Sequence, residues 1–288
     1  MRSRSAFRNW VEYAAIRGVL ALVSLAPPLA TVFLKLLNIA VPKLRRVALR
    51  NLELAGLPAG HASEMLESFA RMMVMFTRFP SINKSNVAQW IRYEGFEHFE
   101  KALAQGNGVL FATAHLGNWE LSAFAHALMS KPMYVVVRPL DNPLIDAFVE
   151  MRRSASGNII LGKKDFMRGI LRALAANEAV GVLVDQNVGL NEGVFVDFFG
   201  RKACVSPTFA KIAARTGAAV IPGFAVWSNV EQKYILRFYP PVPISGEMQA
   251  DTQAIQSAVE AAIRTYPGQW LWMHRRWKTR PPGEAPLY

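Results

Sequence analysis

Gly108-Val-Leu-Phe-Ala-Thr-Ala-His115-Leu-Gly-Asn-Trp-Glu120 is the stretch that decides the fold of this chain. Its first half is a short apolar run flanked by glycine, which is typical of a strand buried on both faces. Polar residues that can carry chemistry follow directly. In open α/β sheets, ligands bind beyond the carboxyl ends of the strands. The stretch therefore predicts an α/β sheet with a site at its edge.

The spacing of His115 and Glu120 constrains how the two side chains can meet. Residues five apart do not share a helix face, so we expect His115 in the turn and Glu120 on the first turn of the next helix. Gly117 would supply the flexible backbone between them. Glu120 would then accept the imidazole N–H and make His115 a stronger base. The alternative is a buried structural histidine and a solvent-exposed glutamate, and the position at a strand end favours function.

No activated nucleophile accompanies this pair in the sequence. There is no G-x-S-x-G elbow, and the single cysteine, Cys204, has no histidine nearby, so we expect it to be a small buried residue. One cysteine also excludes a disulfide scaffold and a cysteine-rich metal site. We therefore expect a base that activates a hydroxyl of a second substrate, without an acyl-enzyme.

Strand and helix patterns alternate through the rest of the chain. Further strands are expected at Met133–Arg138, Asn158–Leu161, Ala179–Val184, Ala218–Val226 and Tyr234–Tyr239. Helices are expected at Ser206–Thr216 and Asp251–Tyr266, and residues 44–92 also have a helical pattern. The predicted fold class is α/β, with a mixed, largely parallel sheet flanked by helices.

The positive charge is concentrated at the two ends of the chain. The 288 residues carry a net charge of +12: residues 1–50 hold +8, residues 264–280 hold +5, and all the others together hold −1. A basic excess points to nucleic acid, an anionic membrane or a phosphorylated substrate. The mean hydropathy of +0.15 and the apolar N-terminus disfavour nucleic acid.

The N-terminal segment predicts a membrane-associated helical extension. Gly18–Leu34 is uncharged, and basic residues flank it on both sides. Pro27-Pro28 would break a single spanning helix, so we expect two half-length helices. A membrane-surface anchor is preferred over a cleaved signal peptide, and a helical hairpin in the core is the competing interpretation.

This organisation predicts two parts. Residues 1–50 would form the basic, apolar anchor, and residues 51–288 a single domain. The domain would comprise a helical lead-in (51–105), an α/β core (106–266) and a basic aromatic segment (267–288).

Five motifs in order resemble one protein family. His115–Glu120 is similar to the H-x-x-x-x-(D/E) motif of glycerolipid-type acyltransferases. Four further segments narrow the resemblance to the lipid A biosynthesis acyltransferases, the lauroyl and myristoyl transferases of lipopolysaccharide assembly: Arg138-Pro-Leu-Asp-Asn-Pro-Leu-Ile-Asp146, Asp185-Gln186, Val194-Phe-Val-Asp-Phe-Phe-Gly200 and Gln269-Trp-Leu-Trp-Met-His-Arg-Arg-Trp-Lys-Thr-Arg-Pro281. One departure follows Asp185-Gln186, where many relatives have an aromatic residue and this chain has Asn187-Val188.

The resemblance implies roles for the residues around the first motif. His115 would be the general base and Glu120 would orient it. Arg153, in Arg153-x-x-x-Gly157, would stabilise the thioester oxyanion or bind a phosphate, and its neighbour Arg152 ranks below it. Asp185 would support the site, with capping of the following loop as the alternative.

Two more groups of residues are implied in substrate binding. Arg138 and Asn142 would bind substrate, although shaping a turn around the neighbouring prolines is the slightly better interpretation. Arg275, Arg276 and Lys278 would contact an acceptor phosphate or the membrane surface. The alternative for this C-terminal segment is an amphipathic element packed on the core.

The function implied is transfer of a fatty acyl group from an acyl carrier protein thioester to a hydroxyl of a Kdo-bearing lipid A precursor. It would take place in a ternary complex at the cytoplasmic face of a bacterial inner membrane, with anionic inner-membrane lipids as partners. No metal, bound cofactor or nucleic acid is implied. The nearest alternative is the same chemistry on a glycolipid, an aminolipid or a phosphatidylinositol mannoside, with acyl-CoA as another donor. A thioesterase and a non-catalytic basic protein are the remaining alternatives.

Overall fold

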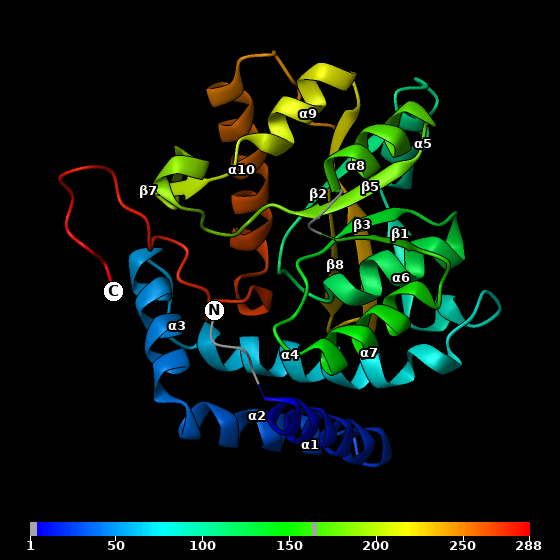
Figure 1. Ribbon diagram of the computed structural model, residues 1–288, viewed down its shortest axis with the longest axis vertical. Coiled ribbons are helices and arrows are strands. Elements are labelled where there is room, and N and C mark those ends of the chain that lie inside the picture. The colour runs from blue at the N-terminus through cyan, green and yellow to red at the C-terminus, as the bar shows by residue number, and fades with distance from the viewer. Residues whose placement is uncertain (1–4, 163–165) are drawn as a thin grey trace.

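A seven-stranded sheet with helices on both faces forms the centre of the protein (Figure 1). The computed structural model describes residues 5–162 and 166–288. The strand order is β1-β9-β8-β2-β5-β3-β4. In chain order the strands of the sheet are β1 (Ile91–Glu94), β2 (Val109–Thr113), β3 (Tyr134–Val136), β4 (Ile159–Leu161), β5 (Ala179–Leu183), β8 (Ala219–Ser228) and β9 (Lys233–Phe238).

Five neighbouring strands, from β8 through β2, β5 and β3 to β4, run parallel. Strand β9 is antiparallel to β8, and β1 is parallel to β9. The sheet is therefore mixed and largely parallel, which confirms the predicted class. Because β2 and β5 are parallel neighbours, the residues that follow Thr113 and Leu183 emerge side by side at one edge of the sheet.

Helices cover the two faces of the sheet in separate groups. On one face, α5 and α6 pack on Val109 and Phe111 of β2. On the other face, α8, α9 and α10 pack on Leu110 and Ala112 of the same strand. The helices are α1 (Ala6–Leu25), α2 (Leu29–Ala40), α3 (Pro42–Leu54), α4 (His61–Arg78), α5 (Phe96–Leu103), α6 (Trp119–Met129), α7 (Pro143–Ser154), α8 (Phe166–Ala175), α9 (Thr208–Thr216) and α10 (Met248–Thr265), with short 3₁₀ turns at Phe79–Ser81, Val87–Gln89, Leu190–Glu192 and Pro267–Gln269.

The predicted strands and helices are confirmed with small shifts of their ends, and three strands were missed. Residues 44–92 are not helical throughout, because α3 ends at Leu54, α4 ends at Arg78 and β1 begins at Ile91. The helical lead-in assigned to 51–105 therefore contains an edge strand. Strands β6 (Val194–Phe198) and β7 (Arg201–Val205) form a hairpin that the helical and strand patterns did not indicate.

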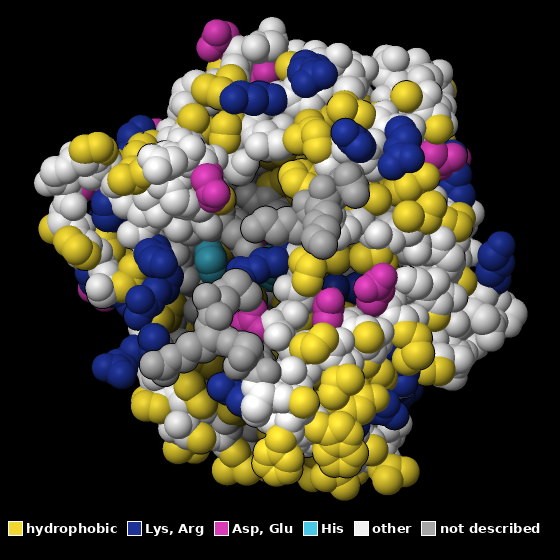
Figure 2. Space-filling view, in the orientation of Figure 1, with side chains coloured by type: hydrophobic (Ala, Val, Ile, Leu, Met, Phe, Trp, Pro, Cys, Tyr) yellow, Lys and Arg dark blue, Asp and Glu magenta, His cyan; other side chains and the backbone are white. Residues whose placement is uncertain are grey.

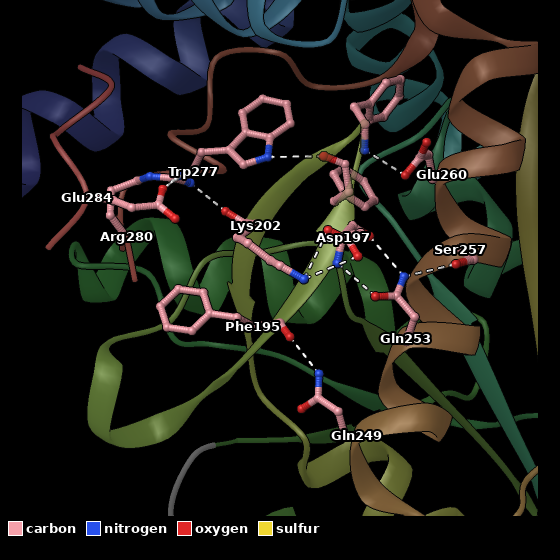
Figure 3. Close-up of polar contacts among 12 residues, drawn as sticks. Phe195, Asp197, Lys202, Gln249, Gln253, Ser257, Glu260, Trp277, Arg280 and Glu284 are labelled. Atoms are coloured by element: carbon pink, nitrogen blue, oxygen red, sulfur yellow. Dashed lines mark hydrogen bonds and ion pairs between the residues drawn. The ribbon is translucent and has the colours of Figure 1, made fainter. Parts of the chain in front are cut away.

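The β6–β7 hairpin is tied to α10 and to the C-terminal segment by polar contacts (Figure 3). Gln253 on α10 forms a pair of hydrogen bonds with the backbone of Asp197, and Gln249 donates to the carbonyl of Phe195. From the other side, the indole of Trp277 donates to the carbonyl of Phe198 and Arg280 donates to that of Lys202. These contacts bring the C-terminal segment against the body of the protein.

The N-terminal helices form a half-buried pair below α4 (Figure 1). As predicted, the chain breaks at Pro27-Pro28, between α1 and α2. Val23, Ala30 and Leu34 are buried in a core cluster shared with α4. The outer surface of the pair exposes large apolar side chains, among them Trp10 and Leu25. No helix in residues 5–162 or 166–288 is long and apolar enough to cross a membrane, and the membrane association of this pair stays a prediction.

The C-terminal aromatic residues are core residues. Trp270, Trp272 and Trp277 are at most 1% exposed, and the side chain of Arg276 is fully buried. Arg276 donates to the carbonyl of Cys204 and to Gln256, and it lies over the ring of Phe198. Burial lowers the pKa of Arg276 to about 10, despite the opposing influence of Asp185. The expected contact of Arg276 with phosphate or membrane is therefore wrong.

The packing of Arg276 predicts a difference between neighbouring basic residues. Arg276→Ala leaves a cavity, removes the donor to Oε1 of Gln256 and removes one of the two donors to the carbonyl of Cys204, so it should lower the free energy of unfolding by about 3 kcal/mol. Lys278→Ala, on an exposed side chain, should change it by less than about 0.5 kcal/mol. Chemical denaturation followed by circular dichroism measures both, and equal small effects would contradict the structural role of Arg276.

Candidate active site

His115 and Asp185 meet at the edge of the sheet because their strands are neighbours. His115 follows β2 by two residues, and Asp185 follows β5 by two residues. The imidazole Nδ1 of His115 lies 2.9 Å from Oδ1 of Asp185, and the backbone N–H of His115 donates to Oδ2 at 2.9 Å. Two residues 70 positions apart in the chain thus form one unit.

Asp185 is a buried carboxylate held by donors from two segments. In addition to the two groups of His115, the indole N–H of Trp270 donates to Oδ2 at 2.8 Å. Burial alone would raise the pKa of Asp185, but the charge and hydrogen bonds of His115 and the bond from Trp270 lower it to about 2. Asp185 is therefore ionised and can only accept hydrogen bonds, so Nδ1 of His115 must carry the proton. The neutral imidazole presents the lone pair of Nε2.

Asp185 also makes His115 a stronger base than an ordinary histidine. Burial opposes the charged imidazolium, but the neighbouring carboxylates, chiefly Asp185, outweigh it and raise the pKa of His115 above 6.5. The edge of Trp119 packs against the imidazole with ring centroids 5.0 Å apart. Nε2 of His115 lies 3.5 Å from the amide nitrogen of Gln186, at the more open side of the ring.

Glu120 lies where predicted, on the first turn of α6, but its partner is not His115. It forms two hydrogen bonds with Arg153 of α7, at 2.8 Å to Nε and 2.6 Å to Nη2. The expectation that Glu120 accepts the imidazole N–H is therefore wrong, because Asp185 is the acceptor. The forked guanidinium matches the carboxylate, which makes the pair rigid. The ion pair with Glu120 raises the pKa of Arg153 against the effect of burial.

The loop between His115 and α6 has a conformation that only glycine allows. Gly117 has a φ of +67°, and a Cβ at this position would overlap the carbonyl oxygen of Ala225 on β8. The next residue, Asn118, donates its backbone N–H to the same carbonyl and caps α6 by accepting from the N–H of Leu121. The turn therefore fixes both His115 and Glu120.

The C-terminal segment completes the site, a role that the sequence did not reveal. Leu271 donates its N–H to the carbonyl of His115, and Gly117 donates its N–H to that of Gln269, so the segment pairs with the turn that holds His115. His274 accepts from the backbone N–H of Asn187, and burial lowers the pKa of His274 to about 4. A neutral His274 fixes the loop that follows Asp185. The only sequence signal was the place of these residues inside the last motif.

Asn142 and Arg138, which were predicted to bind substrate, lie in surroundings that differ from those of His115 and Asp185. Asn142 is buried and caps α7, and its amide donates to Asn9 and Glu12 of α1. It therefore joins two helices, in agreement with the alternative of a structural turn. Arg138 is 85% exposed and lies 4.0 Å from Asp141. Its predicted contact with substrate stays a prediction.

The predictions from the sequence also include Arg275, Lys278, Arg152 and Cys204. The guanidinium of Arg275 lies over the ring of Tyr288, and Lys278 is exposed, so both remain free to face a phosphate or a membrane. Arg152 lies over Phe148 instead of contacting Glu120, which distinguishes it from Arg153. Cys204 is buried, as expected.

An apolar pocket of about 70 Å³ begins at the Glu120–Arg153 pair. It runs between α6 and the sheet, past Thr113 and Leu183 toward Phe111 and Gly181. Its deep part includes His126, for which burial lowers the pKa to about 4, so this imidazole is neutral. The pocket is polar at one end and apolar beyond, and its volume has room for the first carbons of a hydrocarbon tail beside a reactive head.

This site can perform base catalysis on a substrate that enters from one face. In the view of Figure 2 the surface is hollowed near its middle, with basic and acidic side chains around the hollow. Hydrophobic side chains gather along the lower edge of the same face, over α1 and α2. In the part of the chain that the structure describes, no group of three or more His, Cys, Asp or Glu side chains could hold a metal ion.

Comparisons with known proteins show the family of this chain. The family described as "Bacterial lipid A biosynthesis acyltransferase" matches residues 1–279. The lipid A biosynthesis lauroyltransferase of Escherichia coli (strain K12) is 33% identical over 205 residues, which cover 70% of this chain and 66% of that protein. The lipid A biosynthesis palmitoleoyltransferase of the same strain is 31% identical over 208 residues, covering 71% and 67%.

A phosphatidylinositol mannoside acyltransferase of Mycolicibacterium smegmatis is 27% identical over 217 residues, covering 74% of this chain and 70% of that protein. The matched region thus spans about two thirds of the length of these relatives. The family match extends over nearly the whole chain and includes the His115 turn, Asp185 and the C-terminal segment. This chain belongs to the family of bacterial lipid A biosynthesis acyltransferases and is an acyltransferase.

Proposed function

We propose that this acyltransferase moves a fatty acyl group from an acyl carrier protein thioester to a hydroxyl of a Kdo-bearing lipid A precursor. The observation that carries the proposal is the His115–Asp185 unit beside an apolar pocket. The unit supplies a base for a hydroxyl, and the pocket accepts a hydrocarbon chain. The relatives named for lipid A biosynthesis support the acceptor.

The reaction follows from the orientation of the imidazole. Nε2 of His115 removes the proton of the acceptor hydroxyl as its oxygen attacks the thioester carbonyl carbon. Asp185 stabilises the imidazolium that results. The tetrahedral intermediate then collapses, the carbon–sulfur bond breaks, and the imidazolium returns its proton to the leaving thiolate. The products are an ester and a thiol, and both substrates are present together.

The start of α6 provides donors for the oxyanion of the intermediate. The backbone N–H groups of Trp119 and Glu120 form no hydrogen bond with another described residue. The side chain of Asn118 caps the helix by accepting from the N–H of Leu121, so these two N–H groups remain available. Free N–H groups at a helix N-terminus favour negative charge. Arg153 lies beside them. Its pairing with Glu120 aligns the guanidinium, and this contact is the function that we assign to Glu120.

The distribution of charge and apolar surface supports a place at the cytoplasmic face of the inner membrane. The exposed apolar side chains of α1 and α2 suit a helix pair lying in the membrane interface. The net charge of +12 suits an anionic leaflet, a phosphorylated acceptor and an acidic carrier protein. Lys278 and Arg275 are the C-terminal candidates for contact with phosphate.

One alternative acceptor is favoured by a specific observation. Two of the relatives that act as phosphatidylinositol mannoside acyltransferases match this chain at 26% and 27% identity. The same base and pocket would serve a mannose hydroxyl, with acyl-CoA as a further donor. The acceptor and the donor are thus the parts of the proposal that need experiments of their own.

The two carboxylates should have separable effects on the pH profile. The pKa of His115 is raised above its ordinary value of about 6.5. Below this raised pKa the imidazole is protonated and cannot act as a base. We therefore expect the acid limb of kcat/KM above about 6.5. Asp185→Asn removes the charge that raises this pKa, so the limb should move to lower pH, and kcat should fall roughly 10³- to 10⁴-fold.

Glu120→Gln is the matched control for that experiment. It keeps the His115–Asp185 contact and weakens the pair with Arg153, so the rate should fall while the acid limb moves less than in Asp185→Asn. The measurement is kcat/KM between pH 5 and pH 9 for the two variants and the unchanged protein. A larger shift in Glu120→Gln would show that Glu120, not Asp185, orients the base.

The pocket should determine acyl-chain length. Gly223 lines it, and a Cβ there would meet its nearest atoms at 3.7 Å, so a side chain fits the backbone and occupies the pocket. Gly223→Val should shift the preferred acyl chain to a shorter one, measured by competition between acyl donors of different length. Gly60→Val, at a position with open space around it, should leave the preference unchanged. An unchanged preference in Gly223→Val would exclude this pocket as the acyl site.

The acceptor is tested by mass spectrometry of cellular lipids. Deletion of the gene should remove one secondary acyl chain from lipid A, and the intact gene should restore it where His115→Ala does not. If lipid A is unchanged, the proposed acceptor is wrong. Loss of an acyl chain from a mannosylated phosphoinositide or another glycolipid would then identify the alternative.

A further inference from the structure

A second concave surface lies apart from the catalytic residues, between the α1–α2 turn, α4 and the β8–β9 hairpin. It is a groove of about 470 Å³, which we call the α4 groove. Pro27 and Thr31 border it on one side, and Gln232 and Lys233 border it on the other. None of its lining residues belongs to the apolar pocket or to the His115 site. The proposed acyl transfer therefore gives it no role.

Three basic side chains line the α4 groove, and among the described residues none of them forms an ion pair, although Lys233 lies near enough to Glu231 to lower its pKa. Arg71 and Arg78, two turns apart on α4, face Lys233 of β9 across it, and no ion pair within the described residues involves any of the three. Glu67 is the one carboxylate in the lining, so the groove carries a net charge of +2. Two tryptophans support the guanidinium groups, because Arg78 lies 4.7 Å from the ring centre of Trp90 and Arg71 lies 5.5 Å from that of Trp227. Stacking leaves their N–H groups available to an anion.

Buried polar atoms in the groove also lack partners. Tyr234 is 1% exposed and lines the groove, and its hydroxyl lies near the amide of Asn118 without a hydrogen bond of ordinary geometry between them. The Nε of Arg71 is buried and unpartnered as well. Buried donors are almost always satisfied in folded proteins. Two unsatisfied donors beside unpaired cations point to a ligand that supplies acceptor oxygens and negative charge.

The rim of the groove indicates where that ligand comes from. Leu25, beside the α1–α2 turn, is 84% exposed, and Val230, in the β8–β9 turn, is 94% exposed. These two turns border the groove, so apolar side chains project at both sides of a basic, tryptophan-containing hollow. At a membrane surface, apolar side chains enter the hydrocarbon boundary while basic groups and tryptophan remain at the depth of the lipid phosphates.

We propose that the α4 groove binds the phosphate of an anionic glycerophospholipid headgroup. Arg71, Arg78 and Lys233 contact the phosphate oxygens, and Tyr234 donates from the floor. The bound lipid orients the protein on the membrane through α4 and the two turns. This inference concerns lipid binding alone, so it holds or fails independently of the acyl acceptor and donor.

The first experiment measures binding of a soluble lipid to the full chain. Dihexanoyl phosphatidylglycerol, kept below its micelle concentration, should bind saturably in calorimetry, and dihexanoyl phosphatidylcholine should bind at least tenfold more weakly. The triple variant Arg71→Gln, Arg78→Gln, Lys233→Gln should lose binding. Each basic group near an anionic lipid contributes about fivefold in affinity, so the three together should cost roughly a hundredfold.

The matched control removes the same charge elsewhere. Arg172→Gln in α8 with Lys211→Gln and Arg215→Gln in α9 alters exposed side chains at the end of the molecule opposite α1 and α2 (Figure 1). This control should bind the lipid as the unchanged protein does. Thr31→Trp fills the groove without changing charge, and it should weaken binding even though all three basic residues remain. Far-UV circular dichroism confirms the fold of each variant.

Each outcome decides the proposal. Loss of binding in the groove variants alone supports it, and sedimentation with phosphatidylglycerol vesicles should rank the variants in the same order. Equal losses in both triple variants would show a general effect of charge and overturn it. Inorganic phosphate that binds as tightly as the lipid would make this a free phosphate site and overturn the lipid assignment. Binding to vesicles but not to the soluble lipid would also reject a headgroup site.

Discussion

The buried carboxylate of Asp185 is the constraint on which the rest of the site depends. A buried charge is costly unless donors surround it, and here the donors are the side chain and backbone of His115 and the indole of Trp270. These bonds join the ends of β2 and β5 to the C-terminal segment. The sheet register, the catalytic turn and the last residues of the chain must therefore form together before the imidazole has its partner.

The strand, turn and helix around His115 could be predicted from the sequence, but the partner of the imidazole could not. The apolar run before His115 indicated a buried strand, and the turn and helix after it placed Glu120 correctly. The partner of His115 was assigned to Glu120 because that residue is near in the chain. Asp185 is 70 residues away, and it becomes a neighbour only because β5 inserts between β2 and β3 in the sheet. Local periodicity contains no information on strand order, so this contact could not be derived from it.

The C-terminal segment shows the limit of reasoning from charge. Its basic residues have nearly the same appearance in the sequence, yet Arg276 is buried beside Gln256 and Phe198 while Lys278 is exposed. The tryptophans of the segment pack in the core, where two of them donate to buried acceptors, in agreement with the alternative of an element packed on the core. The spacing of Trp270 and Trp272 was the available signal, since residues two apart in an extended segment share a face. Here that face is the interior.

The division of the charges into two pairs determines how basic His115 is. Burial lowers the pKa of His115, and among the neighbouring charges Glu120 raises it and Arg153 lowers it, so the opposing effects of this ion pair leave Asp185 as the charge that raises it most. An isolated Arg153 in the same place would favour the neutral imidazole and weaken the base, whereas an isolated Glu120 would compete with Asp185 for the proton on the ring. Because Arg153 and Glu120 are paired, a cation lies near His115 without weakening the base, and Glu120 does not compete for the proton on the ring. Glu120, the carboxylate of the H-x-x-x-x-E motif, thus acts on Arg153, and through it on the electrostatic balance around His115.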